Sequence, residues 1–295
     1  MRKFNFFVTN DFNGKTTEEF LKQRVGLSSR VIRKIKSEEN NLLKNGSKVR
    51  TVDLINKNDI ITFFLNEKAE ISPLFNSKVK FLYIDEDVIV ADKPSNMPTH
   101  RAKYYQNETL ENAYAGFLIE RKEDITSFKA VYRLDKNTSG LVLIARHSFA
   151  ADYISKNITK QYFAVCHGIF QEKTGLINAP IEREYEKSHK RVVREDGKSA
   201  ITQYQVLQEK ENYSLVKFNL MTGRTHQIRV HINYIGHPLL GDEIYGNEKA
   251  KQFINRQALH CGICTFVHPV LKKEISIVSQ LPMDFKALGF NYKLY

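Results

Sequence analysis

A polar segment, residues 132–140, separates two apolar runs and constrains the fold of this chain more than any other stretch. Ala130-Val131 precede it, and the run 141–145 that follows reads Leu-Val-Leu-Ile-Ala. Short apolar runs rich in branched residues, divided by a polar segment that ends in Gly140, are typical of strand, loop and strand. We therefore expect Asp135 to lie where a strand ends and a loop begins.

Two interpretations of Asp135 are open on the residues alone. Aspartate in a turn often does no more than accept hydrogen bonds from the loop backbone, and spacing by itself favours this structural role. The alternative is chemical, because a carboxylate at the end of a rigid strand is well placed to act on a substrate. Arg133, two residues earlier, supplies a nearby cation.

Length and composition bound the class of protein. The 295 residues suffice for one large domain or two unequal ones. No apolar run approaches the roughly 20 residues of a membrane helix, so we expect no membrane association. The first ten residues lack the pattern of a secretory signal, and the chain has three cysteines. A few unpaired cysteines without a secretion signal indicate the cytoplasm.

The charge balance points to a polyanionic partner. The formal net charge is +12 and the isoelectric point is about 9.4. Such an excess of cations is typical of proteins that bind nucleic acid, although a basic surface without a partner remains the alternative.

The first 70 residues are predicted to form a small basic module. A capping box at 16–19 opens one helix, which Gly26 ends, and a serine caps a second helix that begins at 27–29. Three cations share one face of the second helix: Arg30, Arg33 and Lys34. This face suits a phosphate backbone, and a merely solvated face is the alternative.

Turns and short strands complete the module. Asn45-Gly46 predicts a tight turn before a strand at 48–50, and 57–59 predicts a second turn before a closing strand at 60–64. The polar segment 66–78 is the expected linker. We therefore divide the chain into residues 1–70 and 71–295.

The second part contains further candidate residues. A hairpin at 81–84 and 88–91 leads into a loop, 92–100, that begins with Asp92-Lys93-Pro94. Alternation predicts a strand at 160–168 with Tyr162 on one face, where core packing is the ordinary role of a tyrosine. The charged segment 181–198 is interpreted as a loop or hairpin over the site, with a solvated loop equally compatible.

A helix is predicted after Thr225, which we assign as its N-cap, with Gly236 as its end. Arg229 falls on a face separate from the apolar stripe of this helix. His226 and His231 are five residues apart rather than the four typical of a zinc pair, so no metal is expected there. A single Cys-x-x-Cys at 261–264, with histidines nearby, is also weak evidence, and we predict no metal site.

Four motifs in order resemble those of the RluA-type pseudouridine synthases. They span 92–100, 132–146, 222–246 and 256–269, and one departure is Tyr132, where the family usually has histidine. Short pieces of the N-terminal module are similar to the S4 RNA-binding domain. The resemblance implies an α+β fold, in which a mixed, largely antiparallel sheet follows a small α/β S4-like domain.

The resemblance also implies roles for the candidate residues. Asp135 would be catalytic, Arg229 would hold it ionised, and Tyr162 would stack on the target base. The residues expected to contact substrate or RNA are Arg133, Arg224, Thr225, His226 and Lys93, with Arg30, Arg33 and Lys34 in the module. A monomeric enzyme without a cofactor is expected, because the reaction transfers no group and no electron to a second substrate.

The implied activity is isomerisation of uridine in RNA to pseudouridine. Large-subunit ribosomal RNA is the expected partner, with transfer RNA as the alternative. A rival enzyme class is a glycoside or nucleoside hydrolase, which usually needs a second carboxylate near the first. Asp242 is the nearest candidate for that second group. A rival from another class is a non-catalytic RNA-binding protein.

Overall fold

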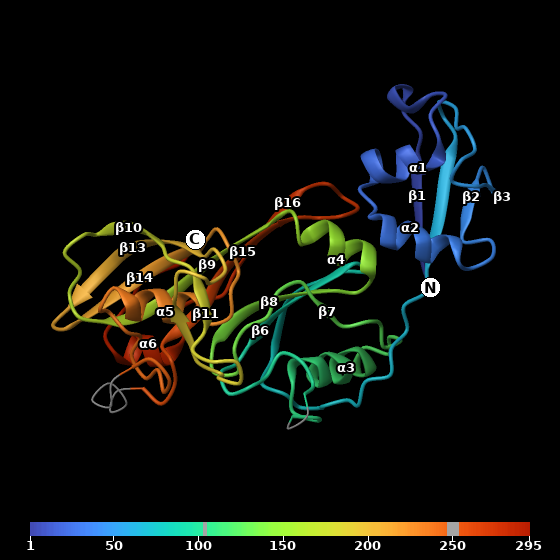
Figure 1. Ribbon diagram of the computed structural model, residues 1–295. Coiled ribbons are helices and arrows are strands. Elements are labelled where there is room, and N and C mark those ends of the chain that lie inside the picture. Colours follow the sequence, from blue (N-terminus) through green and yellow to red (C-terminus); the bar gives the residue numbers. More distant parts are fainter. Residues whose placement is uncertain (103–104, 247–253) are drawn as a thin grey trace.

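Two sheets organise the chain in the computed structural model, which describes residues 1–102, 105–246 and 254–295. A small four-stranded sheet with its helices forms one end of the molecule, and a ten-stranded sheet forms the rest (Figure 1). In the described part of the chain, no helix has the length and apolar content needed to span a bilayer.

The N-terminal module comprises residues 1–65. Its strands, in sheet order, are β1 (Arg2–Phe7), β4 (Ile60–Leu65), β2 (Leu42–Lys44) and β3 (Ser47–Lys48). Its helices are η1 (Asn10–Phe12), α1 (Thr17–Phe20), η2 (Leu21–Val25) and α2 (Ser29–Lys36). The helices lie on the side of this sheet that faces the rest of the molecule (Figure 1).

Local sequence signals placed most of this module. Thr16 and Glu19 form the predicted capping box, and Gly26 ends the first helical segment in a left-handed conformation. Ser28 caps α2 by accepting a hydrogen bond from the Val31 amide. Two details differ: β3 covers Ser47–Lys48 instead of 48–50, and β1, which pairs with β4, was not predicted.

The large sheet is mixed and largely antiparallel, as predicted. Its main path runs β10-β13-β14-β9-β15-β8-β6-β5, with β16 paired to β15 and β7 paired to β8. The strands are β5 (Lys80–Ile84), β6 (Val88–Lys93), β7 (Lys129–Ala130), β8 (Ser139–Ala145), β9 (Ile158–His167), β10 (Thr174–Asn178), β13 (Ile201–Lys210), β14 (Tyr213–Leu220), β15 (Leu259–Val267) and β16 (Glu274–Val278). The parallel pair is β8 and β15.

Gly140 allows that parallel pair to form at the centre of the sheet. Its φ is +110°, and a Cβ atom there would lie 2.3 Å from the carbonyl oxygen of Cys261. Only glycine fits so close to a neighbouring backbone in this conformation. The glycine that ends the polar segment is therefore required by the approach of β15.

The remaining elements cover this sheet. They are α3 (Leu110–Glu120), α4 (Ser148–Ile154), α5 (Gln227–Tyr234) and α6 (Met283–Ala287), with a separate hairpin of β11 (Ile181–Arg183) and β12 (Arg191–Val193). The charged segment 181–198 is thus a hairpin.

Two predicted helix starts are wrong. From the sequence, Ser148 is the expected N-cap of a helix over 149–158. In the structure Ser148 is the first residue of α4, and His147 caps it through Nδ1, which accepts a hydrogen bond from the Ala150 amide 3.1 Å away. The helix ends at Ile154 instead of 158, because β-branched residues open β9 at Ile158.

Thr225 is likewise not the N-cap of α5. His226 precedes the helix with φ 59° and ψ 17°, and no side chain caps it in the ordinary way. The Gln227 side chain instead accepts hydrogen bonds from the Arg224 amide and the Thr222 hydroxyl. These bonds fix the turn before the helix and leave Thr225 exposed.

Candidate active site

Asp135 lies in the loop between β7 and β8, five residues after β7 ends at Ala130. The expected position at the end of a strand is therefore wrong, and the loop itself is what is held rigid. The Leu134 carbonyl accepts a hydrogen bond from Thr99 Oγ1 at 3.0 Å, and Leu134 is buried. The Asp135 carbonyl accepts one from the Thr138 amide at 3.0 Å.

Lys93 braces this loop from below. Its side chain is fully buried, and its Nζ donates to the carbonyl oxygens of Pro94, Met97 and Lys136 at 3.0, 2.8 and 3.1 Å. Burial lowers the pKa of Lys93 to about 7, although nearby Asp135 opposes the shift. The prediction that Lys93 contacts RNA is wrong, since a sealed ammonium can act only by positioning the loop that carries Asp135.

Arg229 joins two carboxylates. Its Nη1 donates to Asp135 Oδ2 at 2.9 Å, while its Nε and Nη2 form a two-pronged contact with Asp242 at 2.7 Å each. The exposed fraction of the side chain is 31% for Asp135, 5% for Arg229 and 0% for Asp242. Buried Asp242 therefore fixes the Arg229 guanidinium, and Arg229 in turn orients the partly exposed carboxylate of Asp135.

The two carboxylates of this cluster stabilise the charge of Arg229. Burial opposes the guanidinium charge, but the hydrogen bonds and charges of Asp242 and Asp135 outweigh it and raise the pKa of Arg229. Asp242 also accepts hydrogen bonds from the Ile244 and Tyr245 amides at 3.0 and 3.2 Å. A carboxylate with these donors is satisfied and fixed, so the orientation of Arg229 is built into the fold.

A cavity of about 820 Å³ opens above Asp135. Tyr162 and His226 also line it, as do the exposed residues Arg133, Arg224 and Thr225. A smaller pocket of about 70 Å³ shares Asp135 and Tyr162 and is lined in addition by Thr138, Ile228, Arg229 and Leu259. The two spaces put a carboxylate, an aromatic ring and several cations around one opening.

Tyr162 comes from β9 and is buried, with 6% of its surface exposed. Burial raises the pKa of Tyr162 well above its ordinary value, and the nearby Asp135 carboxylate adds to the effect. The side chain is therefore a neutral phenol at pH 7, and its hydroxyl can donate a hydrogen bond.

Comparisons with known proteins agree with this site. A family model described as RNA pseudouridylate synthase matches residues 87–234. YlyB of Bacillus subtilis, named as an RNA pseudouridine synthase, is 35% identical over 268 residues, which cover 87% of each chain. Ribosomal large subunit pseudouridine synthase D of Blochmanniella floridana is 35% identical over 83% of this chain and 80% of its own.

The chain belongs to the RNA pseudouridylate synthase family. A solved structure, human RNA pseudouridylate synthase domain containing 1, has the same fold, with a TM-score of 0.58, 24% identity and coverage of 71% of this chain and 86% of its own. The protein is thus an enzyme that acts on RNA, and the alternative of a non-catalytic RNA-binding protein is removed.

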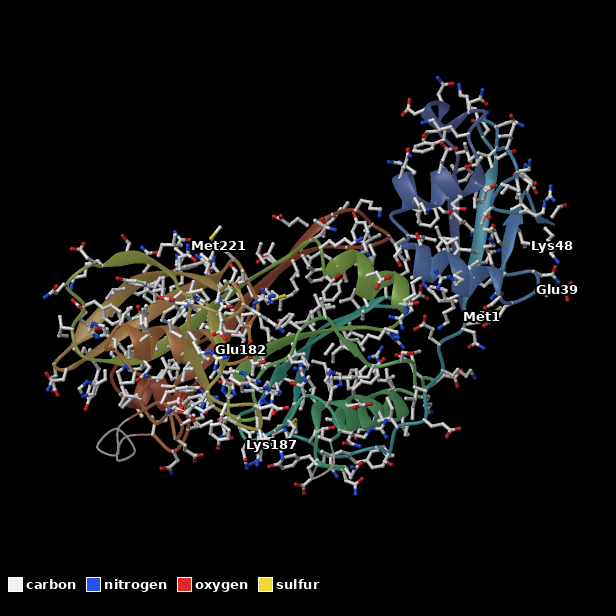
Figure 2. All side chains as sticks on the ribbon, in the orientation of Figure 1. Met1, Glu39, Lys48, Glu182, Lys187 and Met221 are labelled. Atoms are coloured by element: carbon white, nitrogen blue, oxygen red, sulfur yellow. The ribbon has the colours of Figure 1, made fainter. Side chains whose placement is uncertain are left out.

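The sequence did not indicate the roles of two residues at the synthase's active site. Asp242 was considered only as a second acid, whereas it holds Arg229. Met221, at the end of β14, lines the cavity and is 69% exposed; its side chain projects from the surface (Figure 2). An apolar residue directly before the Thr-Gly-Arg-Thr-His motif could have signalled an exposed contact.

His226 lies close to Asp135 without bonding to it. Its Nε2 is 3.7 Å from Asp135 Oδ2, and its Nδ1 is 3.0 Å from the Tyr245 hydroxyl. Burial lowers the pKa of His226, although the charge of Asp135 opposes the change. The ring is therefore mainly neutral at pH 7 and leaves Arg229 as the cation that Asp135 contacts.

We predicted a loop or hairpin over the site, but the hairpin of β11 and β12 does not line the synthase's cavity. Within the described ranges, none of residues 181–198 lines it. The hairpin instead packs behind α5, where the Arg191 amide donates to the Tyr245 hydroxyl at 2.8 Å. Tyr245 links the hairpin to His226 and so to the site.

The basic residues predicted on the second helix lie on α2, outside the cavity. Arg30 and Arg33 are exposed. Lys34 differs, because its Nζ lies 2.9 Å from a carboxylate oxygen of buried Glu67. That ion pair gives Lys34 a structural partner that the sequence did not indicate.

The Cys-x-x-Cys pair is buried, and the neighbouring His260 is engaged in hydrogen bonds within the protein. His260 bonds Ser139 Oγ through Nδ1 and the Ser279 carbonyl through Nε2. Burial raises the pKa of Cys264 to about 11, and that of Cys261 further, so both side chains are neutral thiols.

Proposed function

We propose that this synthase isomerises uridine in large-subunit ribosomal RNA and that Asp135 is its catalytic group. The contact between Arg229 and Asp135 at the floor of a cation-lined cavity carries the proposal. In that contact the guanidinium fixes the direction of the carboxylate through a charge-assisted hydrogen bond.

The reaction rearranges one nucleotide. The bond from ribose C1′ to uracil N1 breaks, the uracil turns, and a bond from C1′ to C5 forms; C5 loses its proton and N1 gains one. Asp135 acts on the sugar as an anion, either by attacking carbon or by removing a sugar proton. Both routes need a carboxylate that the sugar can reach, and the 31% exposure of the Asp135 side chain allows this.

Tyr162 is proposed to hold the base and move its proton. An extruded base is commonly gripped by an aromatic face, and such stacking contributes about 1–3 kcal/mol. Because Tyr162 stays protonated, its hydroxyl supplies a donor beside the rearranging ring. Arg133, exposed at the rim, is suited to enter the space that the base leaves in the RNA.

The hydrolase alternative is disfavoured by Asp242. A glycosidase needs a second carboxyl group that reaches the substrate as acid or base. Asp242 has no exposed side-chain surface, and both its oxygens accept hydrogen bonds from Arg229. It therefore cannot supply that second group.

The choice of ribosomal RNA is supported by relatives named as large-subunit synthases, which are 31–35% identical to this chain. We further propose that the enzyme is cytoplasmic and monomeric and that residues 1–70 form an S4-like RNA-binding domain. Transfer RNA is the competing target.

Mapping pseudouridine in total RNA tests the proposal. Ribosomal and transfer RNA from a strain without this gene are compared with RNA from strains that carry the wild-type protein or Asp135→Asn. We expect one or a few large-subunit positions to lose pseudouridine and to regain it with the wild type alone. Loss confined to transfer RNA would overturn the proposed target, and restoration by Asp135→Asn would overturn the catalytic role.

A further inference from the structure

The N-terminal module shares its hydrophobic core with α4 of the catalytic region. Phe149 of α4 is fully buried among residues of the module. Its ring centroid lies 5.6 Å from that of Phe4 and 6.1 Å from that of Phe63. A side chain of the catalytic region that is buried in the core of the module ties the two parts together. These contacts therefore indicate that the module has a fixed position on the catalytic region.

Polar contacts of α4 and of the turn between β15 and β16 with the module also hold this position. Ser28, the N-cap of α2, donates a hydrogen bond to Asp152. Lys272, in the turn between β15 and β16, donates to the Val25 carbonyl at 2.9 Å and places its Nζ 3.7 Å from the centroid of the Tyr153 ring. Both α4 and this turn extend toward the module (Figure 1).

A third set of contacts joins the linker and β1 to the same region. Glu67 accepts hydrogen bonds from the Ser148 amide at the start of α4 and pairs with Lys34 of the module and Lys129 of β7. Arg2 pairs with Asp87 at 2.9 Å. The module is thus held by an apolar core and by charges at separate points.

The catalytic cavity reaches the far end of the same helix. Ser155, directly after α4, lines the cavity together with Ile158 and Lys160 at the start of β9. The seven residues of α4 span about 10 Å at 1.5 Å per residue. One short helix therefore contacts the module along its length and the cavity at its end.

Both parts of this surface carry exposed cations. Lys156 is exposed beside Ser155, and the module adds exposed Arg24 on η2 and Arg30 and Arg33 on α2. Burial, with a smaller contribution from nearby Arg24, lowers the pKa of Lys272 to about 8, which places Arg24 at the junction. Spaced cations beside an RNA-modifying cavity suit a phosphate backbone.

We propose that the module and the catalytic cavity form one rigid RNA-binding surface, with α4 as the spacer that sets the distance between the anchored RNA and the target uridine. This inference rests on the proposed function. The module then does more than add affinity: it admits RNA in which a uridine lies at the right distance from the segment that the module grips.

A thiol cross-link tests whether the docked position is the working one. Ser28→Cys and Asp152→Cys place two thiols at contacting positions, and the three native cysteines are buried. The pair is bridged with a short bifunctional thiol reagent. We expect kcat/KM of the cross-linked enzyme on a long ribosomal RNA fragment to stay within about twofold of the wild-type enzyme. A large loss on cross-linking would overturn the rigid surface, because it would mean that the module must move.

The complementary variant loosens the module without removing a cation. Asp152→Ala with Tyr153→Ala should raise KM on the long fragment about tenfold and leave a short stem-loop with the same uridine within about twofold. Glu39→Ala, on the outer edge of the module (Figure 2), is the matched control and should change neither. Equal loss on both RNAs, or none on the long one, would overturn the spacer role. Absence of pseudouridine in every protein would instead count against the proposed function.

Discussion

Two clusters of carboxylates and cations in this enzyme differ in how fully their carboxylate oxygens are hydrogen-bonded. In the active site, Arg229 joins Asp135 to Asp242. Beneath the module, Asp87 accepts hydrogen bonds from Arg2 at 2.9 Å and His147 at 3.0 Å. The chemistry of the pairs is the same, but among the described residues the Asp135 carboxylate, which faces the catalytic cavity, accepts a hydrogen bond from Arg229 alone.

That difference separates catalysis from docking. In the second cluster, Asp85 also bonds His268 and Tyr83, so its oxygens are engaged, as those of Asp87 are. Asp85, Asp87 and His268 are close enough to hold a metal ion, yet their ligand atoms already have protein partners. A saturated cluster binds domains together, whereas a cluster with one reachable oxygen can act on a substrate.

The sharpest test of the contrast is Asp135→Asn. The change is nearly isosteric but removes the anion, so we expect turnover to fall by roughly 10³-fold or more while RNA binding and Tm stay near wild type. Tritium release from RNA labelled at uridine C5 and thermal unfolding, measured on one preparation, report the two properties. Lower Tm with full activity in the folded fraction would make Asp135 a loop brace.

Tyr162→Phe should have the next largest effect. It keeps the ring and removes the hydroxyl, and loss of a general acid or base commonly costs about 10²–10⁴-fold in rate. Tyr162→Ala removes the ring as well and should also weaken RNA binding. Tritium release and a binding titration on both variants separate the roles, and near-normal turnover by the Phe variant would restrict Tyr162 to stacking.

Asp242→Asn tests whether the sealed carboxylate acts only through Arg229. Breaking a buried ion pair on one side typically costs about 3–5 kcal/mol of stability. We expect a lower Tm, and in the folded fraction a loss of kcat of about 10- to 100-fold with little change in KM, because Asp135 loses its orientation. Exposed Glu243→Gln is the neighbouring control. A change in KM alone would place Asp242 in RNA binding.

The sequence was informative where a local rule decides the structure. The capping box at Thr16, the left-handed Gly26 and the strand that carries Tyr162 follow from residues close in the chain. The resemblance of residues 222–246 to a family motif also indicated Arg229 as the partner of Asp135, and the structure places Arg229 Nη1 2.9 Å away from Asp135 Oδ2.

What the sequence could not predict depends on distant contacts. Nothing near Asp242 shows that it lies behind Arg229, because 13 residues and a turn separate them. Lys93 resembles an exposed loop lysine until three carbonyl groups from two segments enclose it. The sequence also does not indicate that the module docks through Phe149, because an apolar residue in a short helix can pack in any core.

The smallest predicted effect is a loss of docking in acid. Burial opposes the charge of Glu67, but hydrogen bonds from Ser148 and the cations of Lys34 and Lys129 lower its pKa to about 2. For Asp87, hydrogen bonds from His147 and Arg2 outweigh burial and also lower the pKa to about 2. A carboxylate with a lowered pKa stabilises the folded state above its unfolded value of about 4.

The docking contribution of these groups should therefore be constant from pH 7 to about pH 5 and decline between about pH 4 and pH 2. Small-angle scattering at intervals across that range should show the molecule extending as the module separates, before the sheets unfold. Glu67→Gln should give a partly loosened molecule already at neutral pH, with a smaller further change through the acid range because Asp87 still titrates there. Glu70→Gln alters an exposed carboxylate three residues away and should follow the wild-type curve. A scattering profile that stays constant until global unfolding would mean that the apolar contact of Phe149 alone holds the module, and that the charged cluster beneath it adds little.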